Sequence, residues 1–309
     1  MNPARRPAAS PETLGFPYQS RLPRLARTLW DMIQRELVDR LSELPWLDQV
    51  ADTVSGLTNP ILDSVTGLKD LLHGRWLGHA LHPVVTDLPI GFWISSLLLD
   101  LVGAGKSAGL LSAAGSVSAL GAVATGLADW TPTYGSERRL GMLHALLNTA
   151  GLTCQVVSLS ARLRGRRLRA IAFSATGLSI SSAAAYLGGE LVMNNGVMVN
   201  HTAWESGPED WTVVGASSDW AEGQTKPLEA GGRALLVSRF GGQFQAISAT
   251  CSHAGGPLGK GEVKGGVVTC PWHGSQFRVD DGEVVRAPAT FCQPRLQARV
   301  TEGQVQVKA

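Results

Sequence analysis

Two short segments near the C-terminal end of the chain each combine a thiol with an imidazole. They are Cys251-Ser-His253 and Cys270-Pro-Trp-His273. Together they offer two sulfur and two nitrogen donors, a set that suits zinc or iron. A Cys and a His only one residue apart reach a single tetrahedral metal with difficulty, whereas two adjacent irons can each take one type of donor. We therefore expect these four side chains to hold a two-iron centre.

The longer segments around these residues, Cys-Ser-His-Ala-Gly-Gly-Pro-Leu from Cys251 and Cys-Pro-Trp-His-Gly-Ser-Gln-Phe from Cys270, resemble the Rieske family. The resemblance covers about residues 210–309. It implies a small all-β domain with a [2Fe–2S] cluster, in which two Cys bind one iron and two His bind the other. A structural Cys2His2 zinc site, or no metal, stays open as an alternative, although neither segment has the usual Cys-x2–4-Cys pair of zinc sites.

Neighbouring residues carry the finer part of the resemblance. The Rieske proteins of respiratory bc-type complexes have a disulfide where this chain has Gly256 and Trp272. Ser275 matches a hydroxyl donor that raises the potential, whereas Phe277 replaces a Tyr that does the same. Gly274 is small enough for backbone N–H groups to turn toward the cluster sulfurs. We expect a potential in the lower or middle part of the roughly −150 to +300 mV Rieske range.

Composition excludes several other classes of protein. The chain has 309 residues, enough for two domains, and a net charge of +2 without a basic block, so nucleic acid is not an expected partner. Of its four cysteines, Cys154 lies in an apolar stretch and Cys292 has no evident partner. No disulfide framework is therefore expected.

Four apolar runs of membrane-spanning length occupy the middle of the chain. They cover residues 89–104, 107–128, 141–161 and 170–191. Their small residues suit close helix packing in lipid. The expected fold is thus an all-α four-helix transmembrane bundle followed by the small all-β domain. A soluble bundle of buried helices is the alternative, and four successive runs poor in charge argue against it.

Residues of about 70–200 also resemble a family of four-helix bacterial membrane proteins of unknown function. The resemblance is carried by the stretch 72–91, by Gly126-Leu-Ala-Asp129-Trp130, by His144 with Asn148, and by Gly188-Gly189. It implies a multi-pass protein of the bacterial cell membrane, in contact with membrane lipid, and it implies no particular activity.

The expected organisation of the chain has four parts. Residues 1–20 are expected to be disordered, and residues 21–80 to form amphipathic or interfacial helices, one from Leu25 to Leu41 and a shorter one from Ile61 to Leu72. The transmembrane domain is expected over residues 81–195. Residues 205–309 form the expected iron–sulfur domain, with alternating apolar residues and hairpin turns at Gly241-Gly242, 280–282 and Glu302-Gly303. Its metal-binding loops would leave both His side chains near solvent.

Polar side chains in or next to the apolar runs suggest a second site. His82, His144 and Asp129 map to the side of the bundle that carries the iron–sulfur domain. They could bind haem b or another metal, line a quinone or proton site, or form a structural hydrogen-bond network with Asn148. Asp100 maps to the other side, where it could pair with Lys106 or cap its helix.

Two arguments about the orientation of the chain in the membrane conflict. Five arginines between residues 162 and 169, together with Lys106, predict cytoplasmic loops at the end opposite to the iron–sulfur domain. That domain would then lie outside, yet iron–sulfur clusters are assembled in the cytoplasm and no export signal is visible. The side of the membrane stays open, with the outside favoured.

The leading functional hypothesis is a membrane-anchored one-electron transfer protein whose partner is a redox protein or a quinone. It would be the electron-transfer component of an oxidoreductase system rather than a stand-alone catalyst. The alternative is a subunit or enzyme of a quinol-linked oxidoreductase, with a haem or quinone site in the bundle. A third reading is a metal-dependent structural module. A Rieske oxygenase is not expected, because no His follows His273 to hold a catalytic iron.

Overall fold

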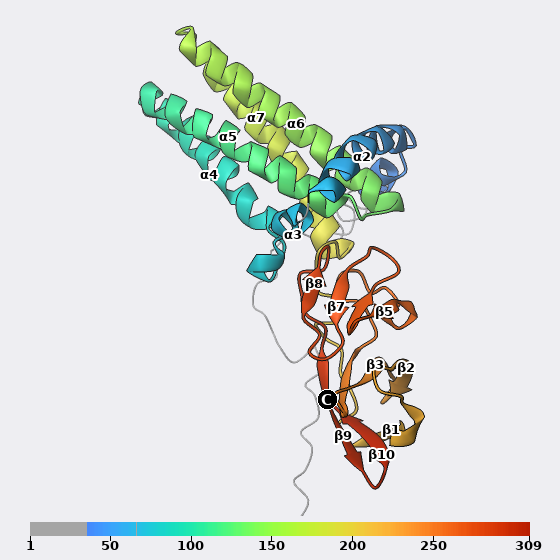
Figure 1. Cartoon of the computed structure of the whole chain (residues 1–309). Coiled ribbons are helices and arrows are strands. Elements are labelled where there is room, and N and C mark those ends of the chain that lie inside the picture. The colour runs from blue at the N-terminus through green and yellow to red at the C-terminus, as the bar shows by residue number, and fades with distance from the viewer. Residues whose placement is uncertain (1–35, 66) are drawn as a thin grey trace, which may run out of the picture. The chain divides into compact units, whose positions relative to one another are not determined.

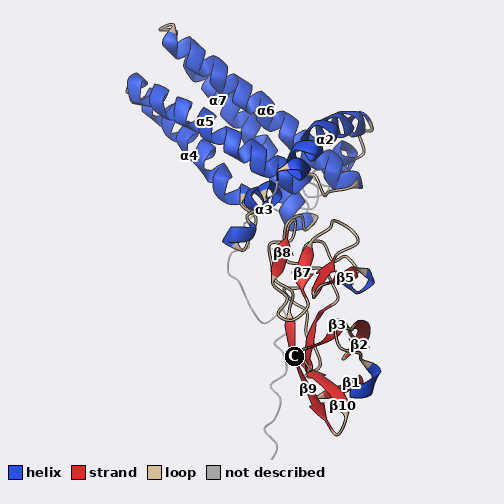
Figure 2. Ribbon diagram, in the orientation of Figure 1, coloured by secondary structure: helices blue, strands red, loops and turns tan. Residues whose placement is uncertain are grey.

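The computed structural model of the chain describes residues 36–65 and 67–309. The disorder predicted for residues 1–20 and most of the helix predicted from Leu25 lie outside this range. Residues 36–42 are helical. Residues 42–309 form one compact unit, in which helices occupy the N-terminal part and strands the C-terminal part (Figure 2).

Four long helices follow one another with short connections (Figure 1). They are α4 (His82–Leu101), α5 (Gly105–Trp130), α6 (Gly135–Leu163) and α7 (Arg167–Gly189), the last continued by a π-helical turn, Glu190–Asn194. All four are long and apolar enough to cross a membrane. Each begins before the apolar run that predicted it, because a polar first turn is compatible with a helix although it interrupts the hydropathy pattern, and α4 ends at Leu101, before the end of its run. Helix α4 starts at His82, with Pro83 in its first turn, where Pro is tolerated.

A buried ion pair joins α4 to α6 at the end of the bundle that carries the arginine-rich loop. The Arg162 guanidinium donates two hydrogen bonds of 2.6 Å to the Asp100 carboxylate, and these side chains are 9% and 0% exposed. Arg167 donates to the Asp100 carbonyl oxygen at 2.6 Å. The predicted pairing of Asp100 with Lys106 is therefore wrong, because Arg162 reaches it from the adjacent helix hairpin.

Helix α2 (Trp46–Ser64) lies against α6 near the other end of the bundle. Its buried Leu47 and Ala51 pack with Trp130 and Met142. The helix predicted over 61–72 is divided in the structure, since α2 continues through Pro60 to Ser64 and a separate helix, α3, covers Leu68–His73. The short 3-10 turn Arg75–Leu77 then leads to α4.

The C-terminal domain contains two antiparallel sheets. The first has the order β1-β10-β9-β4-β3-β2 and the second β5-β6-β7-β8. The strands are β1 (Thr212–Ala216), β2 (Thr225–Ala230), β3 (Arg233–Phe240), β4 (Gln243–Ser248), β5 (Glu262–Lys264), β6 (Val267–Thr269), β7 (Gln276–Arg278), β8 (Val284–Arg286), β9 (Arg295–Thr301) and β10 (Gln304–Lys308). An all-α region followed by a small all-β domain confirms the predicted fold class.

Turn chemistry explains the hairpins. Gly241 and Gly242 join β3 to β4 with φ of 60° and 72°, the left-handed values that a two-residue hairpin turn requires. The hairpins predicted around 280–282 and at Glu302-Gly303 are confirmed by the pairs β7–β8 and β9–β10. Another hairpin turn, at Gly265-Gly266, joins β5 to β6 just before Cys270.

Candidate metal centre

Two loops next to the second sheet carry the predicted ligands. The first, residues 251–256, follows β4 and precedes the 3-10 turn Leu258–Lys260, and the second, residues 270–275, joins β6 to β7. We call them the two cysteine loops. In each, the cysteine N–H donates to the carbonyl of the fifth residue on, which is Gly256 at 2.8 Å and Ser275 at 2.8 Å. Both loops are thus closed by the same hydrogen bond.

The matching glycine in each loop completes this shared conformation. Gly255 donates to the Cys251 carbonyl at 2.9 Å, and Gly274 donates to the Cys270 carbonyl at 3.0 Å. Their φ angles are +69° and +73°, in the left-handed region that favours glycine. A glycine is therefore favoured at position 274 by the backbone conformation of the loop.

The four predicted ligands gather at the tips of the two loops. Cys251 and Cys270 are buried in the core cluster that includes Phe277 and Leu258. The Nδ1 atoms of His253 and His273 lie 3.2 Å apart, and the two rings meet edge to face. Sulfur donors thus pair with sulfur, and nitrogen donors with nitrogen. Within the described residues, no three or more His, Cys, Asp or Glu side chains converge as they would around one ion.

The loop backbone prepares both sulfurs for ligation. A hydrogen bond from the Cys251 thiol lowers the pKa of Cys270 to about 6, and the N–H groups of Trp272 and His273 add to this effect. The Cys270 sulfur and burial raise the pKa of Cys251, while the N–H groups of His253 and Ala254 oppose the rise. Each sulfur therefore faces two backbone N–H groups, an arrangement that stabilises bound thiolate.

The first of the two imidazoles is held in the form that binds metals. Burial, helped by the neighbouring His273, lowers the pKa of His253 to about 3. Burial also lowers the pKa of His273. Both rings are thus neutral near pH 7 and keep a lone pair for a metal.

The positions expected to lack a disulfide lie against each other. A Cβ atom on Gly256 would come within 3.0 Å of the Trp272 ring and 3.1 Å of the Cys270 sulfur. Cys154, Cys251, Cys270 and Cys292 are all free thiols. The Trp272 ring therefore packs over Gly256 and connects the two loops without a covalent link, while 54% of Trp272 remains exposed.

Both histidines are less exposed than the sequence suggested. His253 is only 7% exposed, and His273 stacks on Tyr134, which lies between α5 and α6, with ring centroids 5.2 Å apart. The backbone N–H of His201 also donates to the Ser252 carbonyl at 3.0 Å. The expectation that the imidazoles lie near solvent is therefore wrong for His253, which the helical part of the chain covers, whereas His273 remains partly exposed.

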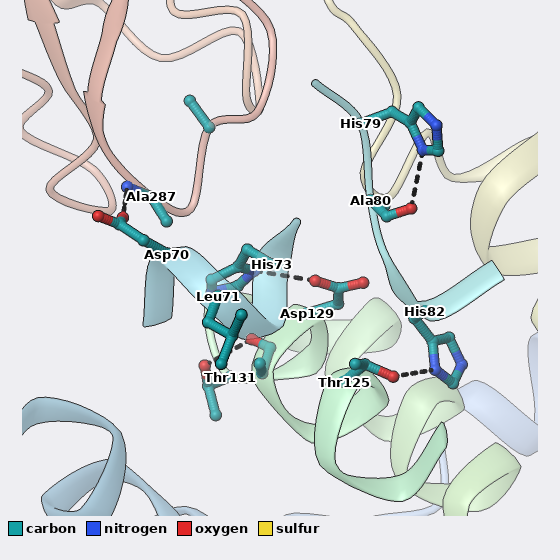
Figure 3. A network of polar contacts seen from close by, with 12 residues as sticks. Asp70, Leu71, His73, His79, Ala80, His82, Thr125, Asp129, Thr131 and Ala287 are labelled. Carbon is teal, nitrogen blue, oxygen red and sulfur yellow. Dashed lines mark hydrogen bonds and ion pairs between the residues drawn. The ribbon is translucent and has the colours of Figure 1, made fainter. Parts of the chain in front are cut away.

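Two further contacts hold the β domain against the helical region. The Asp70 carboxylate accepts a hydrogen bond of 2.8 Å from the Ala287 N–H, as Figure 3 shows, and Arg75 donates to the Val284 carbonyl at 3.1 Å. Asp70 and Arg75 also form an ion pair with each other. Sequence analysis missed these residues and Tyr134, because they become neighbours of the β domain only through folding.

Two of the three polar residues predicted to act together, Asp129 and His82, each have a hydrogen-bond partner that was not predicted (Figure 3). Asp129 accepts a hydrogen bond of 2.8 Å from buried His73, and His82 instead contacts Thr125. His82 and His144 face each other with ring centroids 6.4 Å apart. Asp129 thus takes its hydrogen bond from His73 and not from His82 or His144, and a joint role of the three predicted residues stays a prediction. The sequence does not point to His73, because it lies 56 residues before Asp129 and no local pattern connects the two.

Comparisons with known proteins assign both halves of the chain. Residues 210–299 match the family described as "Rieske [2Fe-2S] domain", and residues 78–201 match "Predicted membrane protein (DUF2231)". Ferredoxin CarAc of Metapseudomonas resinovorans is 37% identical over 98 residues, which are 31% of this chain and 92% of that protein. The ferredoxin component of biphenyl 2,3-dioxygenase of Rhodococcus jostii (strain RHA1) is 37% identical over 25% of this chain and 73% of its own length.

A much longer relative matches this chain over a similar length. Apoptosis-inducing factor 3 of Homo sapiens is 33% identical over 91 residues, 29% of this chain, and the match spans 15% of its length. The domain matched at residues 210–299 carries a [2Fe–2S] cluster as its cofactor.

Ser275 offers a test of how the second cysteine loop tunes the cluster. Its buried Oγ accepts a hydrogen bond of 3.0 Å from the Ala289 N–H, which leaves the hydroxyl proton for another acceptor. We expect Ser275→Ala to lower the reduction potential by about 20–60 mV, the value of one ordinary hydrogen bond in a one-electron couple. A redox titration followed by absorbance measures the change.

The matched control for Ser275 is Ser252 in the first cysteine loop. Its hydroxyl donates to the Phe291 carbonyl at 2.7 Å and is therefore already used. Ser252→Ala is expected to leave the potential within about 10 mV of the parent value, because no hydrogen bond to the cluster is lost. Equal shifts in the two variants would contradict the assigned role of Ser275.

Proposed function

We propose, from the premise that this chain belongs to the Rieske [2Fe–2S] family through residues 210–299, that it is a membrane-anchored one-electron transfer protein. Cys251 and Cys270 would bind one iron, and His253 and His273 the other. The observation that carries this proposal is the pairing of like donors at the tips of two loops with the same backbone conformation. When bound, the cluster supplies reversible storage of one electron and no bond chemistry.

The protein residues have three separate tasks in this proposal. The buried thiols and neutral imidazoles would hold the metal ions, and ligation would require loss of the proton that the two sulfurs share. The backbone N–H groups of both loops stabilise the added negative charge. The Trp272 ring over Gly256 keeps the loops together and shields the sulfurs from water.

The surroundings of the two imidazoles indicate where a redox partner approaches. Tyr134 covers the His273 ring. Trp272 is exposed and lies edge to face with the same ring, with the ring centroids 6.2 Å apart. We propose that a redox protein approaches the cluster beside Trp272. One relative is named as the ferredoxin component of a dioxygenase, biphenyl 2,3-dioxygenase. We accordingly infer a role as the electron-transfer component of an oxidoreductase system.

The proposed location is the bacterial cell membrane, which the chain would cross four times through α4 to α7. The β domain follows α7, so it lies at the end of the bundle where α4 begins. The arginines of residues 162–169 lie at the opposite end, and the positive-inside rule assigns that end to the cytoplasm.

Orientation in the membrane gives one testable prediction. An alkaline phosphatase fused after Ala309 should be active and a green fluorescent protein dark, because the positively charged loops hold the opposite end inside. The matched control fuses the same reporters after Arg164, between α6 and α7, where the reverse pattern is expected. A fluorescent C-terminal fusion with an inactive phosphatase would place the β domain in the cytoplasm and overturn the assignment.

Metal analysis tests the proposed function itself. Purified full-length protein should contain about two irons and two acid-labile sulfides per chain, as a [2Fe–2S] cluster requires. Zinc with no labile sulfide, in protein prepared without oxygen, would favour a structural Cys2His2 site and exclude electron transfer by this domain.

A further inference from the structure

Two histidines in the helical bundle form a site separate from the cysteine loops. His82 is the first residue of α4, and His144 lies in the first half of α6. Their ring centroids are 6.4 Å apart, and the ring planes are nearly perpendicular, at 80°. Neither side chain is needed to explain the iron–sulfur centre.

The hydrogen bonds of His144 fix its tautomer. Its Nδ1 lies 2.7 Å from the Ala184 carbonyl, which can only accept, so Nδ1 carries the proton. Nε2 therefore keeps its lone pair, which now accepts a hydrogen bond of 3.1 Å from the Asn148 amide. A metal-binding histidine commonly donates its other N–H to a carbonyl in this way.

His82 is held in the equivalent form. The Thr125 hydroxyl donates to the Gly121 carbonyl at 2.9 Å, so its oxygen is free to accept from His82 Nδ1 at 3.2 Å. Nε2 of His82 thus also keeps its lone pair. Both rings have Nδ1 fixed by the protein and Nε2 available as a ligand.

Glycines on the other two helices make room for these rings. A Cβ atom on Gly126 of α5 would lie 2.7 Å from Cε1 of His82, and one on Gly188 of α7 would lie 3.0 Å from Cε1 of His144. Any larger residue would therefore displace an imidazole. All four helices thus contribute to the site.

The donor set restricts what the pair can bind. In the described residues no third His, Cys, Asp or Glu completes a site for a bare ion. A divalent cation held by two neutral imidazoles inside a membrane bundle would keep its full charge, which is costly there. A metal that brings its own in-plane ligands and compensating negative charge avoids this cost, and an iron porphyrin does both.

We propose that His82 and His144 are the two axial ligands of a haem in the bundle. Two metal–nitrogen bonds of about 2 Å, with an imidazole at each end, fit the observed separation of the rings. Ligation at Nε2 of His144 replaces its hydrogen bond from Asn148. With both axial positions taken, such a haem exchanges single electrons and has no position for a substrate.

Spectroscopy of the full-length protein tests this proposal. The protein is purified in detergent from cells supplied with a haem precursor, and haem is counted as its pyridine complex. About one haem per chain is expected, with the low-spin spectrum of two imidazole ligands. His82→Ala and His144→Ala should each lower the haem content at least about tenfold. His144→Met should keep haem but change the low-spin spectrum, because Met can replace His as an axial ligand.

Two control variants separate ligation from a structural network. His79 is exposed and its ring is hydrogen-bonded to the adjacent Ala80 carbonyl, so His79→Ala should keep its haem. Asn148→Ala should keep it too, because ligation does not use Asn148. Protein with the full content of iron and labile sulfide but less than about one haem per ten chains overturns this inference and leaves the proposed function intact. Haem in protein without labile sulfide would support this inference and contradict the proposed function.

Discussion

Replacing Cys251 or Cys270 by serine is expected to remove the [2Fe–2S] cluster from the protein. Each sulfur is buried and faces backbone N–H groups that stabilise a thiolate. A serine hydroxyl stays protonated near pH 7 and is a harder, weaker ligand for iron. Acid-labile sulfide should fall from about two per chain to near zero, together with the visible absorption of the cluster.

The chain provides matched controls for these substitutions. Cys292 is exposed and Cys154 lies in α6, and both are free thiols outside the cysteine loops. Cys292→Ser and Cys154→Ser should keep iron and sulfide at the parent level. If Cys292→Ser lost the cluster as fully as Cys251→Ser, the assignment of ligands to the two loops would be wrong.

The second large effect is expected in the helical bundle, where Arg162→Ala should strongly destabilise the protein. The substitution leaves the Asp100 carboxylate buried without the two hydrogen bonds it now accepts. Breaking one side of a buried ion pair costs about 3–5 kcal/mol. We expect this loss in the free energy of unfolding, measured in detergent by the helical circular dichroism signal.

Two comparisons show whether the effect comes from the buried charge. Arg164 is exposed on the loop after α6, so Arg164→Ala should change the unfolding free energy by less than about 1 kcal/mol. The double variant Asp100→Leu/Arg162→Met removes both charges and should recover most of the lost stability. A double variant as unstable as Arg162→Ala would show that packing, rather than an unpaired charge, explains the loss.

Local chemistry made part of this protein predictable from its sequence. Ligand type and spacing within a short loop are sequence properties, so the two cysteine segments could be recognised before their contacts were known. The hairpin at Gly241-Gly242 was equally evident, because few residues adopt left-handed backbone angles. The apolar runs indicated α4 to α7 in the same way, although the helices extend beyond them.

Pairings between distant segments could not be predicted. His73 and Asp129 are 56 residues apart, and neither lies in a pattern that points to the other. Tyr134 occupies an ordinary loop position, yet the fold brings its ring onto His273. The charges of Asp100 and Arg162 were visible, but which basic residue reached Asp100 depended on how the helix hairpins pack. Periodicity gives the face of a helix and not its neighbour.

Electron paramagnetic resonance of the reduced full-length protein tests the central claim most directly. Two nitrogen ligands on one iron and two sulfur ligands on the other make the cluster electronically asymmetric. After reduction with dithionite, we expect a rhombic signal whose average g value lies below that of clusters with four cysteine ligands. The absence of any such signal in protein of full iron content, or the signal of an all-cysteine cluster, would contradict ligation by His253 and His273.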